Sequence, residues 1–252
     1  MIDKAIEEFK KYTSNYLDYG KMITLKINHT FRVVDLCEKL AISLNLSEEE
    51  INIAKIIGLL HDIGRFEQWK DYETFADRKS IDHADLGISI LQKDNYIRKF
   101  IEDDSYDDII INSIKYHNKC TIPEDLDEKT SLFVKLIRDA DKIDILYLYV
   151  DREVDLDLDD TPFIDTIYNN LINKKIIDRN YIKTKTDRLS ISLGFVFDIN
   201  YEYSFKYLND IKYYDNIIDF YKGKTNNKDL NEQLENIRKV INDYIKENIY
   251  AR

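Results

Sequence analysis

Four histidines are the residues of this chain with the clearest potential for chemistry. They are His29, His61, His83 and His117, and the 252-residue sequence has no others. His61 is followed directly by Asp62, where an apolar run ends. An imidazole and a carboxylate buried without partners are costly, so such groups normally have hydrogen-bond partners or a metal. Imidazoles with carboxylates suit Mn, Fe, Co, Ni or Zn. The alternative is four separate core histidines, each with its own hydrogen bond.

Further carboxylates occur in the segment "RDADKID". Asp139, Asp141 and Asp144 lie in a stretch that is otherwise rich in Ile and Leu. Asp141 falls on one apolar stripe of the expected helix and Asp139 falls on another, so periodicity leaves both open as ligands. A solvated acidic face is the third reading of this segment.

The elements that must position these residues are expected to be helices. Ser47 and Glu50 form the pattern of a capping box at the start of the helix that leads to His61. Residues 66–80 are expected to form an ordered loop, and 188–203 either a strand or a buried helix. Helices are expected at 2–18, 24–45, 48–62 and 130–150, and two more are expected to begin near Ser80 and Ser105. After an acidic turn at 151–161, helices are expected through most of 162–252.

These elements predict an all-α bundle. The metal-binding core is expected at residues 1–150, and a helical extension that packs on it at 151–252. The chain has 6 glycines and no glycine-rich phosphate loop, so phosphate chemistry would need a metal or basic side chains. The net charge of −11 argues against binding duplex nucleic acid or membranes through bulk charge. With no apolar run of about 18 residues and no CxxC, a cytoplasmic protein is expected.

The order His29, His61-Asp62, Asp141 resembles the HD-domain metal-dependent phosphohydrolase superfamily. The segments "HTFRV", "LLHDIGR" and "ADKID" agree with this resemblance, which covers about residues 24–150. It implies an all-helical bundle that holds one or two divalent metals, with His29, His61, Asp62 and Asp141 as ligands. Mn²⁺ or Fe²⁺ is favoured, and Mg²⁺, Co²⁺, Ni²⁺ and Zn²⁺ are alternatives. "HDIGRFEQ" and the segments after it are similar to a group of bacterial HD proteins.

His83 and His117 extend the minimal motif. Their segments, "DHADLGISIL" and "IKYHNK", are similar to those of two-metal subgroups such as the HD-GYP phosphodiesterases, but this chain has no GYP segment and has Asn118 in place of a second histidine. The two histidines either complete a second metal site that Asp62 bridges, or contact the phosphate and protonate the leaving group. Asp62, His83 and His117 are therefore the expected catalytic residues.

Basic residues near the motif are candidate phosphate ligands, and surface ion pairs are the alternative for each. Phe66 or Trp69 is a candidate for stacking on a base. The candidate phosphate ligands are Arg32, Arg65, Arg78, Lys79 and Lys142.

The function implied is a phosphohydrolase that uses a metal-activated water on a nucleotide or another small phosphorylated substrate. It would be a phosphomonoesterase, a phosphodiesterase or a nucleotide pyrophosphohydrolase. The alternatives are a di-iron oxygenase on the same scaffold and a non-catalytic sensor that binds a nucleotide. The sequence is also compatible with a homodimer.

Overall fold

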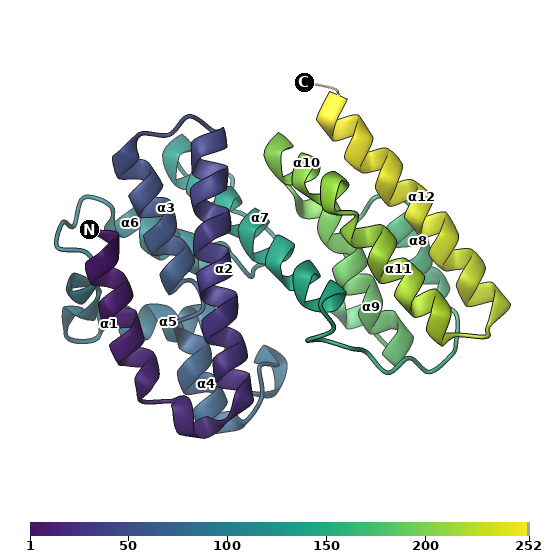
Figure 1. The fold of residues 1–252 in the computed structure, drawn as a ribbon, viewed down its shortest axis with the longest axis horizontal. Helices are drawn as coiled ribbons and strands as arrows, with labels where there is room; N and C mark the ends of the chain where they lie inside the picture. Colours follow the sequence, from purple (N-terminus) through teal and green to yellow (C-terminus); the bar gives the residue numbers. More distant parts are fainter. Residues whose placement is uncertain (251–252) are drawn as a thin grey trace. The chain divides into compact units, whose positions relative to one another are not determined.

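The chain is helical throughout its regular structure, in a computed structural model that describes residues 1–250 (Figure 1). No strand occurs among these residues, so the prediction of an all-α fold is confirmed. The chain divides into two compact units, Met1–Asp141 and Lys142–Arg252, and the division falls inside α7 (Glu128–Val150). The limits expected from the sequence, with a boundary at residue 150, stay a prediction.

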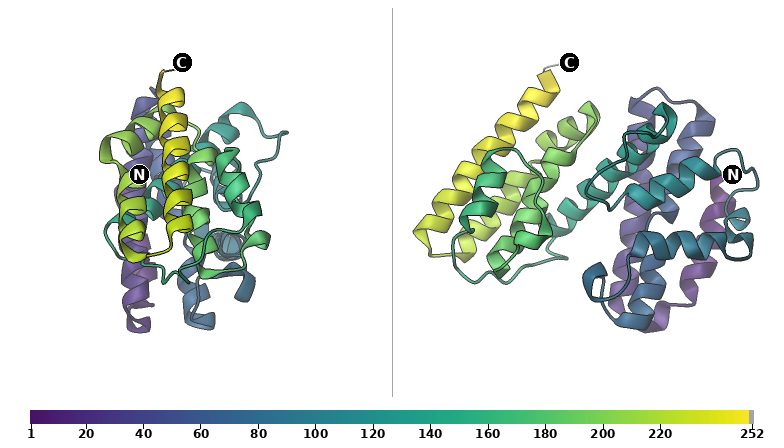
Figure 2. Two further views of the ribbon diagram at one scale, coloured as in Figure 1. Left: turned by 90° about the vertical axis from the view of Figure 1, so that its right-hand side faces the viewer. Right: turned by 180° about the vertical axis from the view of Figure 1, so that it is seen from behind.

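The first unit contains the helices that carry the four histidines. Helix α2 packs along α3, and α5 contacts both α4 and α6; Figure 2 gives two further views. This unit consists of α1 (Ile2–Ser14), η1 (Leu17–Tyr19), α2 (Lys21–Ser43), α3 (Glu48–Leu60), α4 (Gly64–Tyr72), η2 (Asp77–Lys79), α5 (His83–Gln92), η3 (Lys93–Lys99), α6 (Asp107–Tyr116) and the first part of α7.

Local sequence signals explain where several of these helices begin. The capping box of α3 is confirmed: the Glu50 N–H donates to the Ser47 hydroxyl, and the Ser47 N–H donates to the Glu50 carboxylate. Helix α5 begins at His83 rather than near Ser80. Its N-cap is Asp82, which accepts hydrogen bonds from the N–H groups of Ala84 and Asp85.

The prediction of a loop at 66–80 is wrong for the first half of this segment, because α4 extends to Tyr72. Its inward face includes Phe66 and Gln68, both fully buried, and a buried glutamine interrupts the apolar period that would indicate a helix. The helix ends at Glu73, whose φ of 50° is left-handed. At 188–203, the strand alternative is also wrong, since the segment is helical or 3₁₀ over most of its length.

The second unit is built around α12. Buried leucine and isoleucine side chains recur at helical spacing along α12, which packs against α8, α10 and α11. The unit contains α8 (Asp165–Ile172), η4 (Arg179–Tyr181), α9 (Lys185–Leu193), η5 (Gly194–Asp198), α10 (Glu202–Ile211), α11 (Tyr213–Lys224) and α12 (Lys228–Tyr250). Helices were expected through 162–252, of which 251–252 lie outside the described residues. Among the helices described, none is both long enough and apolar enough to cross a bilayer.

A close approach of α4 and α5 depends on the glycine that follows "HDI". A Cβ atom on Gly64 would lie 2.2 Å from the carbonyl oxygen of His83 and 2.7 Å from the backbone nitrogen of Gly87. Backbone atoms cannot yield as a flexible side chain can, so Gly64 lets the first turn of α5 lie directly against α4. This contact sets where His83 stands.

Replacing Gly64 with alanine should therefore force α4 and α5 apart. We expect Gly64→Ala to lower the free energy of unfolding by about 1–3 kcal/mol or more, as overpacking does, in urea titrations. Gly223→Ala is the matched control, because no atom lies within 4 Å of a Cβ built there in α11. Equal stability of the two variants would contradict the close approach.

Candidate metal centre

His29, His61 and Asp141 converge within the first unit. The Nε2 atoms of His29 and His61 lie 3.3 Å and 3.7 Å from Oδ1 of Asp141. Both histidines are fully buried, whereas the Asp141 side chain is 14% exposed. Two ligands that are each about 2.1 Å from one ion lie about 3–4 Å apart, so these atoms have the spacing of a shared coordination shell. Asp139, the alternative ligand, is not in this group.

Asp62, His83 and His117 form a second group beside the first. Oδ1 of Asp62 lies 3.3 Å from His83 Nε2 and 3.8 Å from His117 Nε2. The other oxygen, Oδ2, lies 3.5 Å from His29 Nε2 and 3.6 Å from His61 Nε2. The two oxygens of one buried carboxylate therefore face different groups of histidines.

Hydrogen bonds to the backbone fix the tautomers of two histidines. The Nδ1–H of His61 donates to the carbonyl of Gly58, and that of His117 donates to the carbonyl of Ile114, each at 2.7 Å. A carbonyl oxygen only accepts, so Nδ1 carries the proton and Nε2 has a free lone pair in the neutral ring. Nε2 of His61 is buried and has no hydrogen-bond partner within the described part of the chain.

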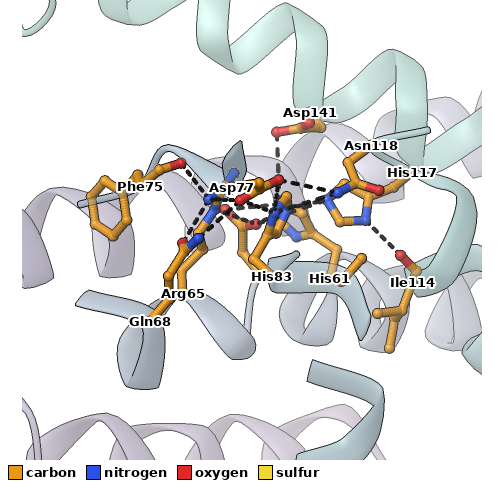
Figure 3. Close-up of polar contacts among 12 residues, drawn as sticks. His61, Arg65, Gln68, Phe75, Asp77, His83, Ile114, His117, Asn118 and Asp141 are labelled. Carbon is orange, nitrogen blue, oxygen red and sulfur yellow. Dashed lines mark hydrogen bonds and ion pairs between the residues drawn. The ribbon is translucent and has the colours of Figure 1, made fainter. Parts of the chain in front are cut away.

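His83 also directs a nitrogen lone pair toward the other histidines of the centre. Its Nδ1 lies 2.8 Å and 3.0 Å from the two carboxylate oxygens of Asp77, so the carboxylate accepts the Nδ1 proton. Its Nε2 then lies 3.0 Å from Nε2 of His117 (Figure 3). Two nitrogen lone pairs at this distance need a cation between them or a proton on one of them.

The titration behaviour of these groups disfavours the proton. Burial lowers the pKa of His117 to about 3, and the neighbouring His83 and His61 contribute to the shift. Burial also lowers the pKa of His83, as does the positive charge of Arg65. Neutral imidazoles with inward lone pairs are the form that binds metals. The donor set therefore fits a divalent metal ion.

The carboxylates of the centre are ionised. Burial acts to raise the pKa of Asp62, but Lys26, His61 and other neighbours outweigh it and hold the pKa well below its usual range. For Asp141 too, burial acts to raise the pKa, but the neighbouring His29 and His61 oppose it and keep the pKa low. Two anionic carboxylates beside the four histidines favour a cation at this position.

Asp77 is the hub of a polar network behind His83. It accepts hydrogen bonds from Arg65 Nη1 at 2.8 Å and from Gln68 Nε2 at 2.9 Å, in addition to the bond from His83. Gln68 is fully buried and accepts from Arg65 at 2.7 Å. A carboxylate bonded to the second nitrogen of a metal-ligating histidine typically fixes the ring's orientation and tautomer.

The basic residues singled out from the sequence have different positions. Arg65 borders the centre, with Nε 3.5 Å from Asp62 Oδ1. Arg32 is partly buried on α2. Lys142 lies in the second unit and pairs with Asp198 at 2.8 Å. Arg78 and Lys79 are exposed on η2 and form no ion pair among the described residues. A phosphate-binding role stays a prediction for all five.

Three residues of the site were missed in the sequence. Nζ of Lys26 lies 2.5 Å from Asp62 Oδ2, and Lys26 precedes His29 by three residues on α2, a spacing that could have indicated it. Asp77 and Gln68 had no such signal, because the loop after α4 brings Asp77 back toward α4.

The geometry thus defines an all-helical protein with a buried histidine–carboxylate centre suited to divalent metal. The family profile described as HD domain matches residues 27–146, which include all the residues of this centre except Lys26. Residues 27–146 are therefore an HD domain. Comparisons with curated proteins and with solved structures gave no match.

The lowered pKa values predict a pH-dependent stability of the metal-free protein. The ordinary pKa of histidine is about 6.5, so between that pH and about 3 the unfolded chain binds more protons than the folded one at His117. The free energy of unfolding should fall with falling pH, by up to about 1.4 kcal/mol per pH unit for each such histidine. Urea titrations in a chelator at a series of pH values measure this slope.

The variant His117→Asn tests the origin of the slope. Its amide can still donate to Ile114, but it does not titrate, so the dependence between pH 6.5 and 4.5 should be shallower. Asp62 and Asp141 affect the free energy of unfolding only below about pH 4. Their pKa values are lowered in the folded protein, so the stability that they contribute is lost only as the pH falls through the acid range. Identical slopes for wild type and variant would contradict the prediction.

Asp77 should affect metal binding through His83. Asp77→Asn keeps the shape of the side chain but removes the charge that holds the His83 ring, so metal affinity should fall about 10–100-fold. Competition with a chromogenic chelator measures the affinity. Asp85→Asn, at an exposed carboxylate on α5, is the control; an equal effect of both substitutions would argue against a specific role of Asp77.

Proposed function

We propose that this protein is a metal-dependent phosphohydrolase that acts on a nucleotide or a similar small phosphoester. The observation that carries the proposal is the convergence of inward imidazole lone pairs on the shared carboxylate of Asp62. His29, His61, Asp62 and Asp141 would hold one divalent ion, Mn²⁺ or Fe²⁺ by preference. When bound, such an ion acts as a Lewis acid and lowers the pKa of a water molecule.

The hydrogen bonds of His83 and His117 favour the ligand role for these residues. Each uses its Nδ1 proton for a fixed partner, Asp77 or the Ile114 carbonyl. In this tautomer Nε2 can accept a metal but cannot donate to a phosphate or a leaving group. We therefore propose that both complete a second metal site with Asp62, and not that they act as proton donors.

The cations at the edge of the centre support an anionic substrate. Lys26 and Arg65 lie beside Asp62 with side chains that are 13% and 14% exposed. Positive groups next to the carboxylates attract and orient a phosphoryl group, which the acidic chain as a whole would repel.

Hydrolysis assays test the proposal. The purified protein, cleared of metal and reloaded with Mn²⁺ or Fe²⁺, should release product from at least one of a panel of nucleoside mono-, di- and triphosphates and cyclic dinucleotides. Asp62→Asn should reduce the rate at least about 100-fold, because it alters the carboxylate shared by both groups.

The control is Lys39→Ala, which removes an exposed charge from α2 and should leave the rate unchanged. Equal background rates for wild type and Asp62→Asn across the panel would contradict a phosphohydrolase. Elemental analysis accompanies the assays. A protein that contains two irons and consumes oxygen, but cleaves no phosphoester, would be a di-iron oxygenase.

A further inference from the structure

The way into the centre is marked by the few side chains that reach solvent. His29, His61 and Asp62 are at most 3% exposed in their side chains. Lys26 and Asp141 are 13% and 14% exposed. These two side chains therefore connect the buried ligands with solvent.

The two cations beside Asp62 differ in how firmly they are held. Nη1 of Arg65 donates to Gln68, to Asp77 and, at 2.7 Å, to the backbone carbonyl of Phe75. These bonds commit the guanidinium to holding the loop after α4. The ammonium of Lys26, in contrast, forms its hydrogen bond among the described residues with Asp62 alone.

A metal ion in the centre would compete with this ammonium. Oδ2 of Asp62 is the oxygen that lies 3.5 Å from His29 and 3.6 Å from His61, so a cation bound by these histidines draws on the same oxygen as Lys26. Two cations that share one carboxylate repel each other unless an anion lies between them. A phosphoryl group, with several anionic oxygens, can satisfy both.

An aromatic ring lies beside both cations. The centroid of the Phe75 ring is 5.6 Å from Lys26 Nζ and 5.7 Å from Arg65 Cζ. The ring is partly exposed, and Figure 3 shows it at the edge of the polar network, beyond Arg65. Trp69 supports it at 4.7 Å between centroids and is itself anchored by its Nε1–H, which donates to the carbonyl of Tyr19.

Phe66 is unsuited to contact a substrate. It is fully buried and packs edge-on against Phe9 and Tyr12. Of the two aromatic residues suggested by "FEQW", only Trp69 contacts the Phe75 ring.

We propose that Lys26 contacts the phosphoryl group of the substrate and that Phe75, backed by Trp69, stacks on its aromatic base. The substrate class is then a nucleoside phosphate, with the phosphate at the metal centre and the base over the loop after α4. This inference rests on the proposed phosphohydrolase function and specifies the substrate of that site.

Binding of two phosphonates separates the phosphate contact from the base contact. The first is the phosphonate analogue of AMP, in which a methylene group replaces the bridging oxygen so that it is not hydrolysed. The second is methylphosphonate, which has no ring. Calorimetry on the Mn²⁺-loaded protein gives both affinities. Because Trp69 is the only tryptophan of the chain, its fluorescence should change when the AMP analogue binds.

The variants should respond differently to the two ligands. Lys26→Met should weaken both about tenfold or more, and Lys26→Arg should restore part of the loss. Phe75→Leu should weaken the AMP analogue about tenfold and leave methylphosphonate unchanged. Lys39→Ala, on the same helix as Lys26, should change neither.

Metal affinity provides an independent measurement for Lys26. With the competing ammonium removed, Lys26→Met should bind Mn²⁺ at least as tightly as the wild type in chelator competition, although it binds phosphonates less well. A general loss of structure would lower both affinities, so a joint loss would overturn the role of Lys26.

Other outcomes decide the remaining parts of the proposal. Unchanged affinity of Lys26→Met for methylphosphonate, or of Phe75→Leu for the AMP analogue, would overturn the corresponding contact. Wild-type protein that binds neither ligand would overturn both. Wild-type protein that binds both ligands but hydrolyses no nucleotide would contradict only the proposed function. Hydrolysis of a nucleotide without these changes in affinity would contradict only the present inference.

Discussion

The centre depends on the contacts of one carboxylate, that of Asp62, with two groups of histidines. One oxygen faces His29, His61 and Lys26, and the other faces His83 and His117. It can serve both groups because it stands in the turn between α3 and α4, buried on all sides. Gly64, two residues later, removes the Cβ that would otherwise hold α5 away. One carboxylate thus faces both groups of histidines, and Gly64 permits the close approach of α4 and α5.

Helix ends orient two of the histidines. His61 and His117 are the C-cap residues of α3 and α6, and each donates its Nδ1 proton to the carbonyl three residues earlier. The last carbonyls of a helix have no partner within the helix, so each imidazole satisfies one of them. A histidine at the end of an apolar helix thus has two effects. It gives a terminal carbonyl a hydrogen-bond donor, and it directs its own Nε2 lone pair inward.

The sequence predicted the all-α fold, and the structure brings together the six residues expected as ligands, because each stands on or at the end of an apolar stripe. The supporting residues could not be predicted in the same way. Asp77 reaches His83 only through the path of the loop after α4, and Gln68 is a buried polar residue whose partners lie on that loop. Periodicity reports which face of a helix is buried, but not which loop returns to it. Helix α4 was missed for a related reason, because the buried Gln68 interrupts its apolar period.

The centre is costly for the fold when it holds no cation. The lone pairs of His83 and His117 face each other at 3.0 Å, and two ionised carboxylates lie within the same buried volume. Apolar side chains of similar size would pack there without this repulsion, and such replacements often stabilise a protein. The ammonium of Lys26 offsets part of the negative charge but cannot lie between the two imidazoles while it pairs with Oδ2 of Asp62. A divalent ion held there would turn the same repulsion into coordination, so the arrangement fits a site for such an ion.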